Sequence, residues 1–157
     1  MTFEAAEAIL SLTLLFGAFV NLGGAWGFLQ NPAKAAAGLG LAVESEAAPK
    51  ESAAALILVR LISVCLVALA MFYAVTALGP LQQPWNVVVA VISRLAGVVF
   101  YAATIIKTGG PLQFKKYVAL NLGLAVSHAI FLVLTPGGLD ALATTWSTFR
   151  WVGTGLS

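Results

Sequence analysis

Few side chains in this sequence could take part in chemistry, and the most informative of them lie inside long apolar segments. Arg94 and His128 lie deepest, while Arg60, Asn21 and Asn121 lie nearer to the ends of their segments. A guanidinium can clamp an anion, and an imidazole can relay a proton. Acid and base catalysis usually needs paired titratable groups, and no carboxylate lies deep in any of these segments. We therefore expect no catalytic residue, and the single His and single Cys predict no metal site.

The composition explains why these polar residues stand out. Of the 157 residues, 61% are hydrophobic and only 9% are charged, whereas soluble domains are about 45–50% apolar and about 25% charged. The 8 basic and 6 acidic residues form no basic stripe that could follow phosphates, so nucleic acid is excluded as a partner. The sequence predicts an integral membrane protein whose surroundings are a lipid bilayer.

Four segments are long and apolar enough to cross about 30 Å of hydrocarbon as helices. They cover residues 6–29, 53–78, 86–106 and 117–135, and sequence rich in Pro and Gly separates them. None alternates polar and apolar residues as the strands of a barrel do. A tail at 138–152 has apolar residues at near-helical spacing, which is typical of an interfacial helix. The predicted fold class is an all-α integral membrane protein, in which residues 1–157 form a single domain: a four-transmembrane-helix bundle with a short C-terminal interfacial helix.

The lysines predict how the chain is oriented in the membrane. They lie in the first and third loops, as Lys34, Lys50, Lys107, Lys115 and Lys116, whereas the other side has only one basic residue, in the tail. Because basic residues near span ends favour the cytoplasmic side, both termini are expected on the non-cytoplasmic side.

The loops make two local predictions. Asn31 and Pro32 begin a short surface helix that ends at Gly38, because Asn is a good N-cap and Pro suits the first turn. The second loop has only about five residues, which predicts that the second and third spans are antiparallel neighbours.

Arg94 requires a partner, because a charge at bilayer depth costs about 2.5–3.5 kcal/mol even on the lenient insertion scale. We expect it to turn toward Glu7 in the first span, with a headgroup phosphate or a backbone carbonyl as the competing acceptor. Such a contact would tie the first span to the third, and the alternative is a site for an anion or another ligand. Arg60 can snorkel to the nearer surface, or share hydrogen bonds with Asn21 and Asn121 at similar depth.

Two other groups of residues have alternative interpretations. His128 is expected to donate to a neighbouring carbonyl, and the alternative is a single haem or pigment ligand; the sequence requires no cofactor. Gly23 with Gly27, and Gly123 with Ser127, are spaced for close helix contact, either inside the monomer or in an oligomer.

Aromatic residues at the span ends are expected to anchor the protein at the two membrane surfaces. Trp85, Trp146 and Trp151 belong to the outer surface, and Trp26 and Tyr117 to the inner one.

Several short motifs together resemble a known family. They are Asn31-Pro32 after the first span, Val59-Arg60-Leu61 in the second, Ser93-Arg94-Leu95 in the third, and the Gly-Gly-Pro loop at 109–111. In this order they resemble the small four-helix bacterial membrane proteins grouped near the DoxX family. The resemblance implies a four-helix bundle in a bacterial inner membrane, and it brings no catalytic residue with it.

Three functions follow, in order of expectation. The first is a non-catalytic accessory or scaffolding subunit that packs against other membrane proteins or against further copies of itself. The second is a small-molecule or lipid carrier with a midplane site near Arg94 and His128, walled by Tyr73 and Tyr101. The third is an enzyme acting on an apolar substrate, which the lack of a deep carboxylate disfavours.

Overall fold

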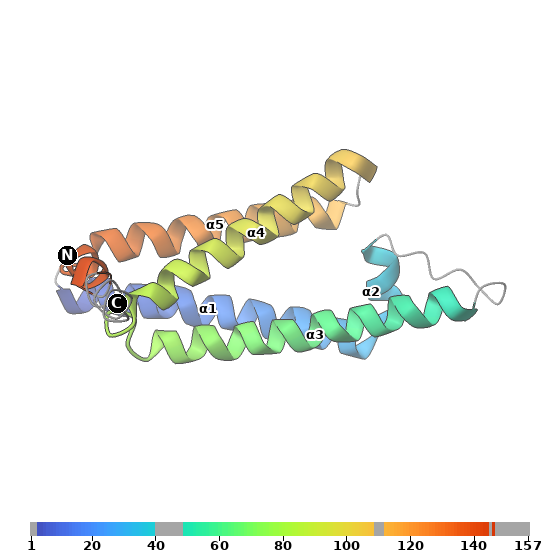
Figure 1. The fold of residues 1–157 in the computed structure, drawn as a ribbon, viewed down its shortest axis with the longest axis horizontal. Helices are drawn as coiled ribbons and strands as arrows, with labels where there is room; N and C mark the ends of the chain where they lie inside the picture. The colour runs from blue at the N-terminus through green and yellow to red at the C-terminus, as the bar shows by residue number, and fades with distance from the viewer. Residues whose placement is uncertain (1–2, 40–48, 109–111, 145, 147–157) are drawn as a thin grey trace, which may run out of the picture.

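The computed structural model describes residues 3–39, 49–108, 112–144 and 146, which are helical apart from short turns (Figure 1). Its helices are α1 (Phe3–Gln30), α2 (Pro32–Gly38), α3 (Pro49–Ala77), α4 (Pro84–Thr108) and α5 (Leu112–Leu134). The four predicted spans correspond to α1, α3, α4 and α5, each of which is long and apolar enough to cross a membrane. The protein is therefore an all-α, multi-pass membrane protein.

The helix starts follow from the local sequence. Pro32, Pro49 and Pro84 each begin a helix, where the missing N–H costs no hydrogen bond. The Asn31 side chain accepts a hydrogen bond of 3.0 Å from the Lys34 N–H, which caps α2 as the sequence predicts. Gly137, with a φ of 80°, lets the chain turn after α5.

The four long helices form two pairs, with α3 packed along α1 and α4 packed along α5. The pairs lie close together at the end that carries the start of α1 and the α3–α4 turn, which we call the terminal end (Figure 1). They lie farther apart at the opposite end, near Lys34, Lys115 and Lys116, which we call the lysine end. The separation between the two helix pairs therefore increases toward the lysine end.

The expectation that the second and third spans are neighbours is wrong along most of their length. The turn between them brings the end of α3 to the start of α4, but the two helices make few contacts beyond it. A short connection fixes only the ends that it joins. The contacts farther along a helix depend on which side chains fit together, and here those of α3 fit α1.

The main core lies toward the terminal end. Leu10 and Leu14 of α1 pack there with Tyr73 of α3 and Val87 of α4, and all four are buried. A smaller cluster fixes α2 against α3 through Ala36 and Val59.

The tail after α5 is helical at residues 138–144 and at Trp146. The Trp146 ring lies 5.6 Å, centroid to centroid, from the ring of Trp85, so two of the tryptophans expected at one membrane surface are in contact. The rest of the tail predicted at 138–152, including Trp151, lies outside the described residues.

The packing of the main core can be tested by substitution of a buried leucine. We expect Leu14→Ala to lower the thermal stability of the purified protein in detergent, because Leu14 is fully buried. The loss should be smaller than the about 2–5 kcal/mol typical of soluble cores, since a leucine in lipid gains no hydrophobic free energy from burial in protein. Leu15→Ala is the control, because Leu15 is 45% exposed and faces out of the bundle. Equal losses for the two variants would contradict the packing.

Candidate functional site

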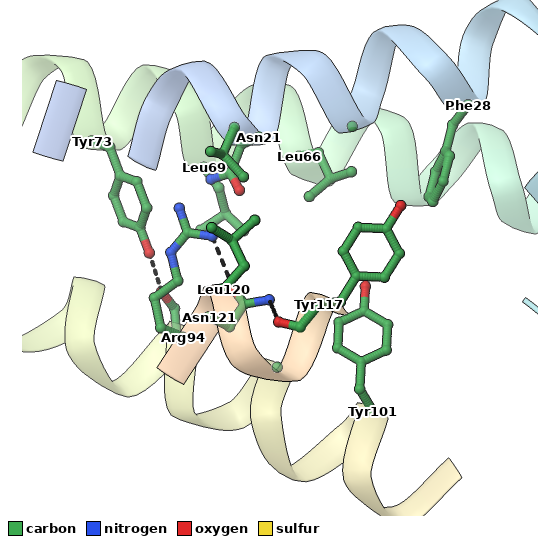
Figure 2. Close-up of a pocket in the computed structure, with 14 residues that line it drawn as sticks. Asn21, Phe28, Leu66, Leu69, Tyr73, Arg94, Tyr101, Tyr117, Leu120 and Asn121 are labelled. Atoms are coloured by element: carbon green, nitrogen blue, oxygen red, sulfur yellow. Dashed lines mark hydrogen bonds between the residues drawn. The ribbon is translucent and has the colours of Figure 1, made fainter. Parts of the chain in front are cut away.

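A cavity of about 150 Å³ lies between the two helix pairs. All four long helices line it, through residues that are adjacent or three to four apart and so lie on one side of each helix. These are Val20, Asn21, Gly24 and Phe28 of α1; Leu66, Leu69 and Tyr73 of α3; Ser93, Arg94, Gly97 and Tyr101 of α4; and Tyr117, Leu120 and Asn121 of α5. Figure 2 shows Tyr73 and Arg94 at one end of the cavity and Phe28, Tyr101 and Tyr117 at the other.

Arg94 connects all four helices at this cavity. Its side chain is 5% exposed, and its terminal nitrogens donate to the Gly17 carbonyl of α1 and to Oδ1 of Asn121 of α5, both at 2.9 Å. The guanidinium carbon lies 4.8 Å from the centre of the Tyr73 ring of α3, within cation–π range. Every one of these partners is electrically neutral.

The predicted pairing of Arg94 with Glu7 is wrong, and the backbone carbonyl that was the competing acceptor takes its place. Glu7 precedes Gly17 by ten residues on α1, which is about 15 Å along a helix axis. The guanidinium lies at the level of Gly17, which is too far along α1 for an ion pair. The expected tie between the first and third spans nevertheless exists, through the Gly17 carbonyl.

Tyr73 is held in place by its hydroxyl. The Tyr73 hydroxyl donates to the Ala90 carbonyl at 3.1 Å, and its oxygen lies 2.7 Å from Oγ of Ser93. These contacts fix the ring of α3 against α4, beside the guanidinium of Arg94. Tyr73 thus joins the two pairs at the end of the cavity that also holds Arg94, and it lines the cavity as the carrier hypothesis predicts.

The two asparagines expected near Arg60 lie at the cavity, and Arg60 does not. Asn121 accepts from Arg94 and donates through Nδ2 to the Tyr117 carbonyl at 2.9 Å. Asn21 is 4% exposed, and its Nδ2 has no hydrogen-bond partner among the described residues. Arg60 is exposed on α3 and is not among the residues lining the cavity. The expectation that it shares hydrogen bonds with Asn21 and Asn121 is therefore wrong.

His128 is fully buried on α5, edge-on to the Tyr73 ring at a centroid distance of 5.9 Å. Neither ring nitrogen makes a hydrogen bond of normal length and angle in the part of the chain that the structure describes, but the backbone of Thr13 on α1 interacts with the imidazole. The expected donation to a neighbouring carbonyl therefore stays a prediction, with the Thr13 carbonyl as its acceptor. His128 also lines none of the described cavities. Because the imidazole has no exposed surface, a haem or pigment could not reach its nitrogens in this conformation.

Aromatic rings form the end of the cavity nearer the lysine end. The rings of Tyr101 and Tyr117 stack with their centroids 5.5 Å apart, and Phe28 lies across from them on α1 (Figure 2). Tyr117 was expected to be a surface anchor, but it belongs to the cavity wall. Its spacing of four residues from Asn121 is the signal that could have placed it there.

Among the described residues, no atom of the monomer lies close to the three glycines that the sequence predicts to pack between helices. A Cβ added at Gly23, Gly27 or Gly123 would meet no atom within 4 Å. Gly123 and Ser127 line an open groove of about 450 Å³ between α1 and α5. Close packing within the monomer is therefore wrong for these glycines.

Comparisons with protein-family models, with curated proteins and with solved structures find no match. No residue role is therefore carried over from a relative.

Gly17 is the position where the site depends on a missing side chain. A Cβ there would lie 3.0 Å from Nη2 of Arg94 and 3.1 Å from the Tyr73 ring. We expect Gly17→Val to displace the guanidinium and to lower the free energy of unfolding by at least about 1–3 kcal/mol, the usual cost of overpacking.

The matched control for this variant is Gly23→Val on the same helix, where an added Cβ meets nothing within 4 Å. Denaturation in detergent micelles would measure both variants. A similar stability for Gly17→Val and Gly23→Val would show that Arg94 does not depend on the close approach to α1.

Proposed function

We propose that the protein is a membrane carrier that binds a small molecule in the cavity between its two helix pairs. The observation that carries the proposal is a buried guanidinium at the wall of a cavity lined by all four long helices, whose partners among the described residues are all neutral. Ionisable groups at bilayer depth are expensive and commonly mark a ligand or ion path. The carrier was the second expectation from the sequence, and the cavity raises it above the first.

The shape of the bundle supports movement of a ligand. The core around Leu10, Leu14 and Val87 closes the space between the pairs at the terminal end, whereas the pairs separate toward the lysine end (Figure 1). Rocking one pair against the other about the cavity would exchange the open and closed ends, which is how many carriers alternate access.

The proposal also includes the kind of membrane that the protein crosses and the orientation of the chain in that membrane. The exposed Lys34, Lys115 and Lys116 at the wider end favour a cytoplasmic position for that end. Both termini would then lie on the non-cytoplasmic side, and the resemblance to DoxX-like proteins favours a bacterial inner membrane. In this orientation the two helix pairs are farther apart on the cytoplasmic side.

A second candidate function is an accessory subunit that packs against another membrane protein or a second copy. Gly23, Gly27 and Gly123 favour it, because they are exposed and open on the outside of the bundle, and such faces let a helix approach closely in lipid. Mass determination of the intact assembly after gentle extraction separates the two. A fixed stoichiometric complex with a different protein supports the subunit, whereas the chain alone or with copies of itself supports the carrier.

Water access to the cavity tests the carrier directly. Cys65 is exposed, so Cys65→Ala provides a background for single cysteines. We expect Leu69→Cys, in the cavity wall, to react with a charged methanethiosulfonate reagent added from the lysine side of membrane vesicles. Its rate should exceed that of a lipid-facing cysteine by at least about tenfold, because only the thiolate reacts and hydrocarbon disfavours its formation.

Val64→Cys on the same helix is the matched lipid-facing position, since Val64 is 63% exposed and is not part of the cavity wall. Equally slow labelling of both positions from both sides of the membrane would mean that the cavity is closed to water, which contradicts a carrier and favours the accessory subunit.

A further inference from the structure

We infer that the cavity takes an apolar molecule with one carboxylate, which is held by Arg94 and Asn21. This inference rests on the proposed function and names the class of its ligand. Three properties of the cavity carry it: its charge, the kind of hydrogen-bonding groups that are free in it, and the size and character of its walls.

The charge of the site requires an anion. Arg94 stays protonated at any physiological pH, and no Asp or Glu is among the residues described as lining the cavity. Its partners Gly17, Asn121 and Tyr73 place partial negative charge near it but do not neutralise it. One full negative charge brought by the ligand would do so, and a single guanidinium matches a monoanion.

The buried polar atoms without a described partner at this cavity, Nε of Arg94 and Nδ2 of Asn21, are donors, which favours a ligand that supplies acceptors. A guanidinium carries five N–H groups, of which one donates to Gly17 and one to Asn121, while Nε has no partner in the described part of the chain. Nδ2 of Asn21 is a further buried donor without a described partner. A carboxylate has two oxygens that only accept, and it pairs with guanidinium through charge-assisted hydrogen bonds.

The walls select an apolar body for the ligand. Leu66, Leu69 and Leu120 line the cavity between its polar end and the stacked rings of Tyr101 and Tyr117. The volume of about 150 Å³ equals that of an apolar cavity known to accept benzene. A single ring with a carboxylate therefore fits, and a fatty acid would fit with its chain leaving between the helix pairs.

The depth of Arg94 argues against the phosphate of a membrane lipid. Arg94 follows the start of α4 by ten residues and precedes its end by fourteen, or roughly 15 Å and 21 Å along the helix axis. Lipid headgroups lie at the surfaces of a hydrocarbon layer about 30 Å thick. A headgroup phosphate would have to leave its own layer to reach the guanidinium, whereas a small carboxylate that enters from water is not anchored in that layer.

Isothermal titration of the purified full chain in nanodiscs tests the ligand class. Benzoate and decanoate are the carboxylate probes, benzamide is the neutral counterpart of benzoate, and inorganic phosphate is the competing anion. We expect saturable binding of a carboxylate probe, with benzamide at least about tenfold weaker because it lacks the charged hydrogen bonds. Tighter binding of benzoate indicates a ring, and tighter binding of decanoate indicates a fatty acid.

Three variants assign the binding to the named residues. Arg94→Gln should weaken binding of the preferred carboxylate by about 10- to 100-fold, and Asn21→Leu by about tenfold, through loss of hydrogen bonds to a charged group. Nδ2 of Asn21 has no hydrogen-bond partner among the described residues, so Asn21→Leu is expected to fold and to give a result even where Arg94→Gln does not fold. Arg60→Gln removes an exposed arginine outside the cavity wall and should change the Kd less than twofold.

Distinct outcomes overturn the inference and the proposed function. Benzamide binding as tightly as benzoate, binding of phosphate alone, or equal losses in Asn21→Leu and Arg60→Gln would each overturn the carboxylate assignment. So would the absence of saturable binding by both carboxylate probes. Rapid labelling of Leu69→Cys in any of these cases would leave the carrier standing, whereas its failure to react would overturn the carrier as well.

Discussion

A positive charge held inside an apolar bundle is the constraint on which the rest of the structure depends. Arg94 cannot reach water along α4, so the other helices must supply its polar contacts: two of them accept hydrogen bonds from it and a third supplies an aromatic ring. The Gly17 carbonyl comes from α1, the Asn121 amide from α5 and the Tyr73 ring from α3. Gly17 carries no side chain at the point where both Arg94 and Tyr73 approach α1. One residue thereby sets the depth and the separation at which the two helix pairs meet.

This polar junction has a clear role because lipid gives helices little reason to associate. A leucine that faces lipid is already in an apolar solvent, so packing, small residues and hydrogen bonds must hold the bundle together. The tight core around Leu10 and Leu14 meets that need at the terminal end. Between the core and the lysine end, the polar contacts of Arg94 and the stacked rings of Tyr101 and Tyr117 replace close apolar packing. The cavity thus arises where polar and aromatic groups keep the pairs apart.

Sequence reasoning found most of the residues of this site but not their partners. Arg94 stood out because of its depth, and the tie to the first span was predicted with the wrong acceptor, since a charged residue suggests a charged partner. Asn121 was grouped with Arg60 by depth alone, and depth says nothing about the side of the helix on which a residue lies. Tyr117 was taken for a surface anchor for the same reason. A nearly uniformly apolar helix has no clear polar and apolar sides, so its sequence pattern does not show which side packs against the other helices.

The sequence by itself determined the four membrane-crossing helices, their approximate extents and the short capped α2, because these depend on composition, length and the local chemistry of Pro, Gly and Asn. Only the tertiary structure decided that α3 packs on α1 rather than along α4, that Arg94 finds neutral partners, and that Gly23 and Gly27 remain open. The physical reason is that lipid tails satisfy every apolar face almost equally. The choice among faces therefore depends on side chains far apart in the sequence meeting in space.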